Sequence, residues 1–143
     1  GNLYPTHGLG PVAQAMNINR GDKMDYLVAV SGSDFQMAAM ANELAAKDEY
    51  YKPFAGKKYR GNMNTTVIHT SLGKTIMLQH DVTSPQVYSR IHKISGTKGS
   101  CLKYPLPGRI AFGHEDWLDE TAFKKLEEQY TAPIVKKVGE LAK

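Results

Sequence analysis

Apolar residues recur every three or four positions in three segments of the chain, which is the spacing of a helix with one buried face. The first helix is predicted over residues 8–18. The second is predicted over residues 35–48, where Asp34 is placed to cap the first turn. The third follows Asp119, and the same spacing resumes after an interruption at Pro133.

Shorter runs rich in β-branched residues lie between the helical segments and predict a sheet. Five strands are expected, at Tyr26–Ser31, Asn64–Thr70, Lys74–Thr83, Ser89–Ser95 and Lys98–Lys103. Leu72-Gly73 and Ser84-Pro85-Gln86 are the turns expected to join consecutive strands as hairpins. This order of elements predicts an α+β fold, with an open, mostly antiparallel sheet and helices packed on one face.

The composition indicates one folded domain. The chain has 143 residues, of which 41% are hydrophobic and 22% charged, and these proportions are ordinary for a globular protein. The net charge of +4 is spread over turns and helix ends, so we expect no nucleic-acid partner, which would need a basic face. No apolar run approaches the roughly 20 residues of a membrane span. A single cysteine, Cys101, excludes an intrachain disulfide.

Two patterns that resemble cofactor or metal sites do not meet the conditions for one. Residues 8–13 match the glycine pattern of a dinucleotide fold, but the buried strand that must precede it is missing. His69, His80 and His92 lie on neighbouring predicted strands. The hairpin places His80 opposite roughly residue 65, about 13 Å along the strand from His69. We therefore expect no metal site.

Two stretches carry side chains suited to chemistry on a sugar. Tyr4-Pro5-Thr6-His7 gathers a phenol, a hydroxyl and an imidazole at a helix start, whose partial positive charge favours the neutral imidazole that can accept a proton. The alternative is a helix cap with a structural histidine. Tyr88 and Arg90 follow a polar turn, and here the alternative is an ordinary hairpin. Residues 17–22 are interpreted only as a helix end. The residues alone leave these alternatives open.

Six stretches agree in order and spacing with one known family. They are Gly1–Pro11, Asn17–Asp22, Asp25–Leu27, Gly73–Pro85, Tyr88–His92 and Ser95–Gly99. Together they resemble glycoside hydrolase family 109 of the Gfo/Idh/MocA oxidoreductase superfamily. The match runs through most of residues 1–117, and the helical tail is less diagnostic. The resemblance implies the fold of that superfamily's C-terminal domain.

The resemblance also implies an activity, since enzymes of the family are NAD-dependent α-N-acetylgalactosaminidases. Such an enzyme oxidises the sugar at C3, removes the C2 proton, expels the glycosidic oxygen, adds water and returns the hydride, which differs from the usual two-carboxylate scheme. By position, Tyr4, Pro5, Thr6, His7 and Tyr88 would bind the N-acetylgalactosaminyl glycan. Tyr4 would also touch the NAD, and His7 would be the catalytic acid or base.

The same resemblance implies that residues 1–143 form a single C-terminal domain for substrate binding and oligomerisation, and that the N-terminal dinucleotide-binding domain is absent from this chain. We therefore expect a fragment without glycosidase activity and with negligible NAD affinity. Two alternatives stay open: a sugar oxidoreductase with net hydride transfer, and a purely oligomerising module. A homo-oligomer would form through the sheet face, for which the sequence offers Thr66, Ile68 and Thr70 against Ile76, Leu78 and His80.

Overall fold

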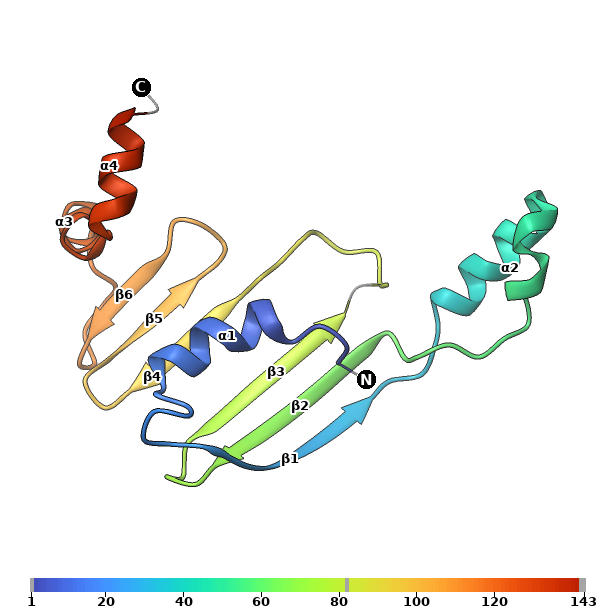
Figure 1. The fold of residues 1–143 in the computed structure, drawn as a ribbon, viewed down its shortest axis with the longest axis horizontal. Coiled ribbons are helices and arrows are strands. Elements are labelled where there is room, and N and C mark those ends of the chain that lie inside the picture. Colours follow the sequence, from blue (N-terminus) through green and yellow to red (C-terminus); the bar gives the residue numbers. More distant parts are fainter. Residues whose placement is uncertain (1, 82, 142–143) are drawn as a thin grey trace. The chain divides into compact units, whose positions relative to one another are not determined.

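The computed structural model of the chain describes residues 2–81 and 83–141. It divides into two compact units, Gly1–Tyr88 and Ser89–Lys143. Each unit holds a three-stranded antiparallel sheet, accompanied by helices (Figure 1). The predicted α+β class is confirmed, and the one open sheet of the prediction corresponds to two smaller sheets. That residues 1–143 act as one C-terminal domain stays a prediction.

The first unit is built on a sheet with strand order β1-β2-β3. Its elements are α1 (Thr6–Ala15), β1 (Met24–Ser31), α2 (Met37–Lys47), η1 (Glu49–Phe54), β2 (Met63–Thr70) and β3 (Thr75–Asp81). Both predicted helices and all three predicted strands of this region are present, with ends shifted by a few residues. The short 3-10 helix η1 was not predicted, because Pro53 within it is typical of a loop.

Helix α1 covers one face of the first sheet. On β2 the residues at alternate positions are buried, namely Asn64, Thr66, Ile68 and Thr70. A Cβ atom added at Gly8 would lie 3.2 Å from Cδ1 of Leu78, so the first turn of α1 runs close over β3. The half-buried side chains of α1 and of its C-cap include Leu9, Val12, Ala13 and Met16, which form one face. Ala15 is exposed, because it lies about a quarter-turn to one side of this face.

The opposite face of the same sheet is apolar and exposed. Paired residues of antiparallel strands share a face, and the register groups Tyr26, Val28 and Val30 of β1 with Val67 and Met77. We call these five residues the open sheet face; they are 60%, 62%, 67%, 46% and 69% exposed. The face proposed from the sequence for oligomerisation is the other one, in which Thr66, Ile68, Thr70 and Ile76 are buried, so that assignment of residues was wrong. Side chains alternate along a strand, and the sequence does not reveal which set the helix covers.

The second unit has strand order β4-β5-β6 and two helices among its described residues. Its elements are β4 (His92–Gly96), β5 (Gly99–Lys103), β6 (Arg109–Phe112), α3 (Glu120–Tyr130) and α4 (Pro133–Leu141). The predicted cap of α3 is confirmed, since the Asp119 carboxylate accepts a hydrogen bond of 2.8 Å from the Ala122 N–H. Strand β6 was not predicted, because the prolines just before it are typical of a loop.

Ser84-Pro85-Gln86 does not form the predicted hairpin. Strands β3 and β4 belong to separate sheets, and the chain between Thr83 and Ile91 is outside any strand. The predicted strands Lys74–Thr83 and Ser89–Ser95 therefore extended too far toward this turn, since β3 ends at Asp81 and β4 begins at His92. The Asp81 carboxylate accepts hydrogen bonds of 3.0 Å from the N–H groups of both Thr83 and Ser84, which turns the chain out of the sheet.

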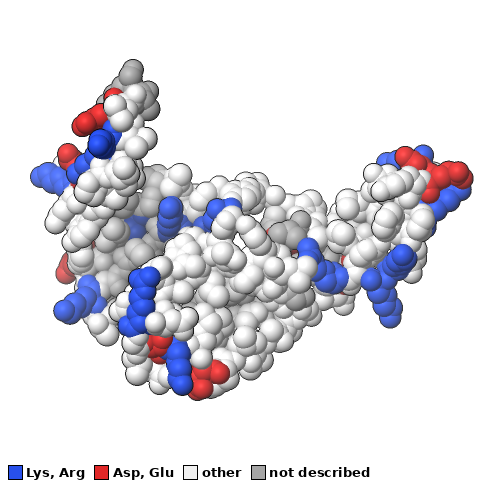
Figure 2. All heavy atoms as spheres, in the orientation of Figure 1, with Lys and Arg blue, Asp and Glu red and all other residues white. Residues whose placement is uncertain are grey.

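Charged side chains are distributed over many elements. On the face drawn in Figure 2, Lys and Arg lie in separate small groups with Asp and Glu among them, and no continuous basic strip is seen. Within the described part of the chain, none of the helices combines the length and the apolar run needed to cross a bilayer.

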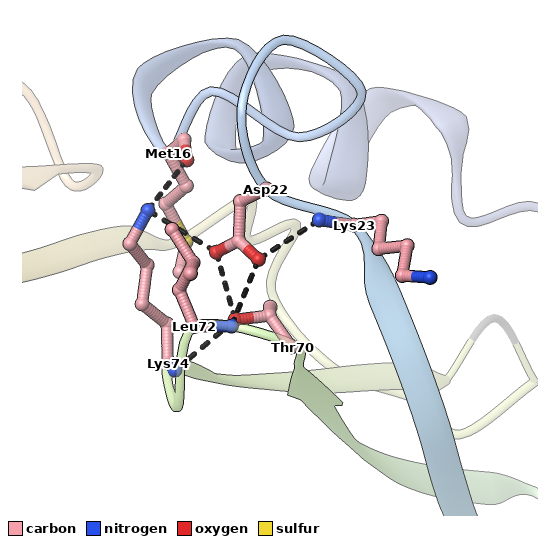
Figure 3. Close-up of polar contacts among 6 residues, drawn as sticks. All are labelled: Met16, Asp22, Lys23, Thr70, Leu72 and Lys74. Carbon is pink, nitrogen blue, oxygen red and sulfur yellow. Dashed lines mark hydrogen bonds and ion pairs between the residues drawn. The ribbon is translucent and has the colours of Figure 1, made fainter.

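A buried carboxylate ties the loop after α1 to the turn between β2 and β3 (Figure 3). Asp22 is 5% exposed, and its Oδ1 accepts hydrogen bonds from the backbone N–H groups of Lys23, at 2.8 Å, and Leu72, at 3.1 Å. Its Oδ2 accepts a hydrogen bond of 2.8 Å from the Thr70 hydroxyl and lies 3.2 Å from the Lys74 ammonium. These donors replace the water that the carboxylate loses on burial.

The same contacts hold the end of α1. The Lys74 ammonium also donates a hydrogen bond of 2.8 Å to the carbonyl of Met16, immediately after the helix. Asn17 and Asn19 adopt positive φ angles of 57° and 63°, conformations that asparagine tolerates better than most residues. The chain thus makes a tight loop that brings Asp22 back under the helix end. Residues 17–22, predicted only as a helix end, thus form a structural junction.

The contacts of Asp22 make folding depend on pH. Burial raises the pKa of the Asp22 carboxyl group, but the hydrogen bonds from Thr70, Lys23, Lys74 and Leu72 outweigh this effect and hold the pKa below its ordinary value. A group whose pKa is lowered by folding stabilises the folded state above its unfolded-state pKa. That contribution is lost as the pH falls through the folded-state pKa.

Replacing Asp22 with asparagine should therefore destabilise the chain at neutral pH. The amide lacks the charge that pairs with Lys74, so we expect a thermal unfolding midpoint several degrees lower at pH 7. The difference from the unsubstituted chain should shrink as the pH falls below about 4. Circular dichroism melts over a pH series provide the measurement, with Asp25→Asn at an exposed position of β1 as the control. Equal midpoints for Asp22→Asn and Asp25→Asn at pH 7 would contradict this role.

Candidate functional site

Tyr4 and His7 form an exposed pair at the start of α1. Pro5 precedes the helix, and its carbonyl accepts hydrogen bonds from the N–H groups of Gly8, at 3.1 Å, and Leu9, at 2.7 Å. The helical hydrogen bonds of α1 therefore begin at the Pro5 carbonyl. Tyr4 Oη, just before the helix, lies 3.2 Å from His7 Nε2. The two rings meet edge to face, with centroids 4.9 Å apart. Tyr4 is 57% exposed, so the phenol points out of the core.

The start of α1 presents polar side chains to solvent. Pro5 stands at the capping position of α1 and makes no side-chain capping hydrogen bond, and Thr6 and His7 follow it in the first turn. Both are exposed, next to backbone N–H groups that carry partial positive charge. An imidazole, a phenol and a hydroxyl on one helix turn can bind the hydroxyls of a sugar and move a proton.

Tyr88 lies on a different segment, which the Asp81 turn anchors. It is 61% exposed, at the end of the first unit. The hydroxyl and then the backbone N–H of Ser84 lower the pKa of the Asp81 carboxyl group against the opposing effect of burial, and the Thr83 N–H and the charge of His80 lower it further. The turn is therefore held by an ionised carboxylate.

The helix start and the Asp81 turn lie toward the same end of the first sheet. The first turn of α1 passes over Leu78, through the approach of Gly8 described above, and Asp81 ends β3 three residues later, about 10 Å further along the strand. Figure 1 shows α1 beginning near the tip of the β3 arrow, from which the segment carrying Tyr88 departs. The structure thus joins Tyr4 to His7 directly, and it places Tyr88 on a separate segment that starts from that end.

The other histidines of the first unit have different surroundings. The His69 ring stacks on Tyr26, with centroids 4.9 Å apart, on the side of the sheet away from α1. His80 pairs with Asn64 across the strands, one residue from the position the sequence predicted. Among residues 2–81 and 83–141, no three His, Cys, Asp or Glu side chains are grouped so that they could hold a metal ion.

The glycine pattern at residues 8–13 lies inside α1. No strand precedes that helix in the described part of the chain, so the geometry of a dinucleotide-binding turn is missing there. Gly8 serves the close packing of the helix on the sheet instead.

Comparison with known proteins agrees with the motifs found in the sequence. The family model for the C-terminal domain of glycosyl hydrolase 109 matches residues 1–143. A glycosyl hydrolase family 109 protein of Phocaeicola vulgatus is 45% identical over 148 residues, which cover 100% of this chain and 34% of that protein.

Two further relatives carry the name of an activity. Proteins named alpha-N-acetylgalactosaminidase, from Bacteroides fragilis and Shewanella oneidensis, are 44% and 42% identical and align with 97% and 99% of this chain. The alignments cover 32% and 31% of those proteins, so the chain spans about a third of the length of the relatives it matches. Since the family model and these relatives cover essentially the whole sequence, the chain belongs to glycosyl hydrolase family 109 and corresponds to its C-terminal domain.

Proposed function

We propose that this chain is the sugar-facing domain of a glycosidase that removes terminal α-linked N-acetylgalactosamine. The observation that carries the proposal is the exposed contact between Tyr4 and His7 at the start of α1. Membership of the family and the names of two relatives supply the reaction class. Tyr4, Pro5, Thr6 and His7 would line one side of the sugar site, and Tyr88 would contact the sugar from its own segment.

His7 is the proposed acid or base. Its Nε2 lies within reach of the Tyr4 hydroxyl, which can orient the imidazole and share a proton with it. The imidazole would take the proton from the carbon next to the oxidised carbon of the sugar, and it would return a proton when water adds. Tyr4 would hold the imidazole ring in one orientation through Nε2, and a fixed orientation is a requirement of proton transfer.

The residues of this chain fit a contact with one end of NAD and not a complete nucleotide site. The described part has no strand and glycine turn arranged for a dinucleotide, whereas the exposed Tyr4 ring offers a flat surface for the nicotinamide. When bound, NAD would supply reversible removal of a hydride from the sugar. Its affinity would come mainly from another part of the parent protein.

The isolated chain should accordingly be inactive. We expect no turnover of a chromogenic α-N-acetylgalactosaminide and no NAD binding by calorimetry at millimolar cofactor. The full-length parent, measured in parallel, should show both. Turnover by residues 1–143 alone would overturn the proposed division of labour.

In the full-length protein, replacement of His7 with glutamine should lower kcat about a hundredfold or more, since the proton transfer loses its catalyst. Tyr88→Phe should raise KM about fivefold with little change in kcat, because it removes one hydrogen bond to the substrate. His114→Gln, at an exposed histidine of the second unit, is the matched control. Steady-state kinetics on the same substrate give the answer, and a His7→Gln enzyme with normal kcat would rule out the proposed role.

The same assay separates the hydrolase from a sugar oxidoreductase. A net hydride transfer would change the NADH absorbance in proportion to turnover. Sugar release at constant NADH absorbance is the result expected for the hydrolase.

We also infer that the open sheet face binds a second copy of the chain. All residues of β1 are exposed, and its apolar side chains continue onto β2 and β3 in the register given above. A soluble protein seldom leaves so contiguous an apolar face without a partner. The occupant favoured is an identical subunit, because a sheet face can match itself across a two-fold axis.

This predicts that a charge on the open sheet face lowers the oligomeric state. Val28→Lys in the full-length protein should shift the mass measured by light scattering from that of a dimer or larger assembly toward that of a monomer. Thr121→Lys, at an exposed position of α3, serves as the control. If the unsubstituted protein is already a monomer, the face is covered from within the parent protein and the inference is wrong.

A further inference from the structure

An arm of 31 residues leaves the first sheet after β1 and returns to it at β2. We call residues 32–62, which contain α2 and η1, the helical arm. Two backbone hydrogen bonds close its base, from the Gly32 N–H to the Met63 carbonyl, at 2.8 Å, and from the Asn62 N–H to the Ser33 carbonyl, at 3.2 Å. The helical arm is thus joined to the sheet beside Asn62, whose side chain makes the contacts that matter next.

The Asn62 amide uses both of its ends. Its Oδ1 accepts hydrogen bonds from the backbone N–H groups of Phe35, at 2.9 Å, and Gln36, at 3.1 Å, just before α2. Its Nδ2 donates a hydrogen bond of 3.0 Å to the hydroxyl of Ser84. Two backbone donors on one side fix which end of the amide is oxygen, so the NH₂ group must face Ser84.

The Ser84 hydroxyl continues the connection. Because it accepts from Asn62, its own proton is available for the Asp81 carboxylate, to which it donates. The backbone N–H groups of Thr83 and Ser84 bond to the same carboxylate. The result is a polar chain from the start of α2 through Asn62 and Ser84 to the end of β3. It fixes the point from which the segment carrying Tyr88 departs.

We propose that Asn62 and Ser84 are positioning residues for Tyr88 in substrate binding. This rests on the proposed function, in which Tyr88 contacts the sugar. Ser84 is followed by Pro85, whose ring restricts the backbone, so the direction fixed at Ser84 carries into the residues that precede Tyr88. Loss of the Ser84 hydroxyl would leave the two backbone bonds to Asp81 in place and free the segment from the helical arm. Sugar binding should weaken, while the chemistry at His7 should continue.

The test compares Ser84→Ala with Ser84→Thr in the full-length, NAD-loaded protein. We expect Ser84→Ala to raise KM about fivefold, because Tyr88 is then less well positioned, with kcat changed by less than about twofold. Ser84→Thr keeps the hydroxyl and should restore KM. Hydrogen exchange measured by mass spectrometry on the peptide covering residues 83–91 gives a readout independent of activity. Exchange should be faster in Ser84→Ala and normal in Ser84→Thr.

A second variant tests the same connection at Asn62, so the result does not depend on one substitution that could disturb folding. Asn62→Asp keeps an oxygen that bonds to Phe35 and Gln36 and replaces the NH₂ group with a second oxygen. Ser84 can bond to that oxygen only by donating the proton that it otherwise gives to Asp81, so the polar chain is broken at one of these two bonds, and KM and exchange should rise in the same way. A thermal melt of each variant checks that the fold is intact.

The outcomes separate this inference from the function on which it rests. If Tyr88→Phe raises KM but Ser84→Ala and Asn62→Asp change neither KM nor exchange, the positioning role is wrong and the sugar contact stands. If Tyr88→Phe leaves KM unchanged, the sugar contact of Tyr88 and the positioning role of Asn62 and Ser84 are both wrong. If Ser84→Ala lowers kcat and leaves KM alone, the hydroxyl acts on the chemistry and the positioning role is likewise excluded.

Discussion

The arrangement of the first unit depends on the carboxylate of Asp22. An ionised group at 5% exposure is costly unless its water is replaced, and here two backbone N–H groups, a hydroxyl and an ammonium replace it. The donors come from the loop after α1 and from the β2–β3 turn, so the carboxylate joins segments about 50 residues apart in the chain. Through Lys74 the same cluster reaches the carbonyl of Met16, which fixes the end of α1. Because a helix is stiff, fixing its end also sets the position of its first turn over the sheet.

The sheet under α1 is unusually polar, and its own hydrogen bonds make this tolerable. The Asn64 amide donates to the Ser31 hydroxyl and accepts from the Thr66 hydroxyl, at 2.9 Å and 3.0 Å, so these buried groups are partnered. Tyr26, Val28 and Val30 of β1, by contrast, lie exposed on the open sheet face, and Leu27 is 58% exposed on the other face. Such exposure of apolar side chains, on a sheet that also buries Ile68 and Ile76, is unlike the surface of a self-sufficient domain. It agrees with a chain that matches about a third of the length of its relatives.

The proposed site combines two kinds of support. Tyr4 and His7 are three residues apart, on either side of the point where α1 begins, and their side chains meet at 3.2 Å. Tyr88 depends instead on a turn held by Asp81, and that turn depends on Asn62, 22 residues away from Ser84. The first pair is close in the chain and includes a residue of the stiff helix α1, whereas the turn before Tyr88 is held by single hydrogen bonds, each worth about 1 kcal/mol. In such a proposed site, Tyr4 and His7 would stay fixed, whereas the position of Tyr88 would depend on the hydrogen bonds that tie its segment to the helical arm.

The sequence by itself determined the features that depend on residues close together in the chain. Periodicity located α1, α2, β2 and β3, the Asp119 cap was confirmed, and the Leu72-Gly73 turn set the strand register to within one residue. Its motifs also identified the family. Only the tertiary structure decided which face of the sheet α1 covers, that Asp22 is buried, and that Asp81 turns the chain out of the sheet where a hairpin was predicted. The physical reason is that burial and polar partnering depend on which distant segments meet. A carboxylate looks the same in a sequence whether water or four protein donors surround it.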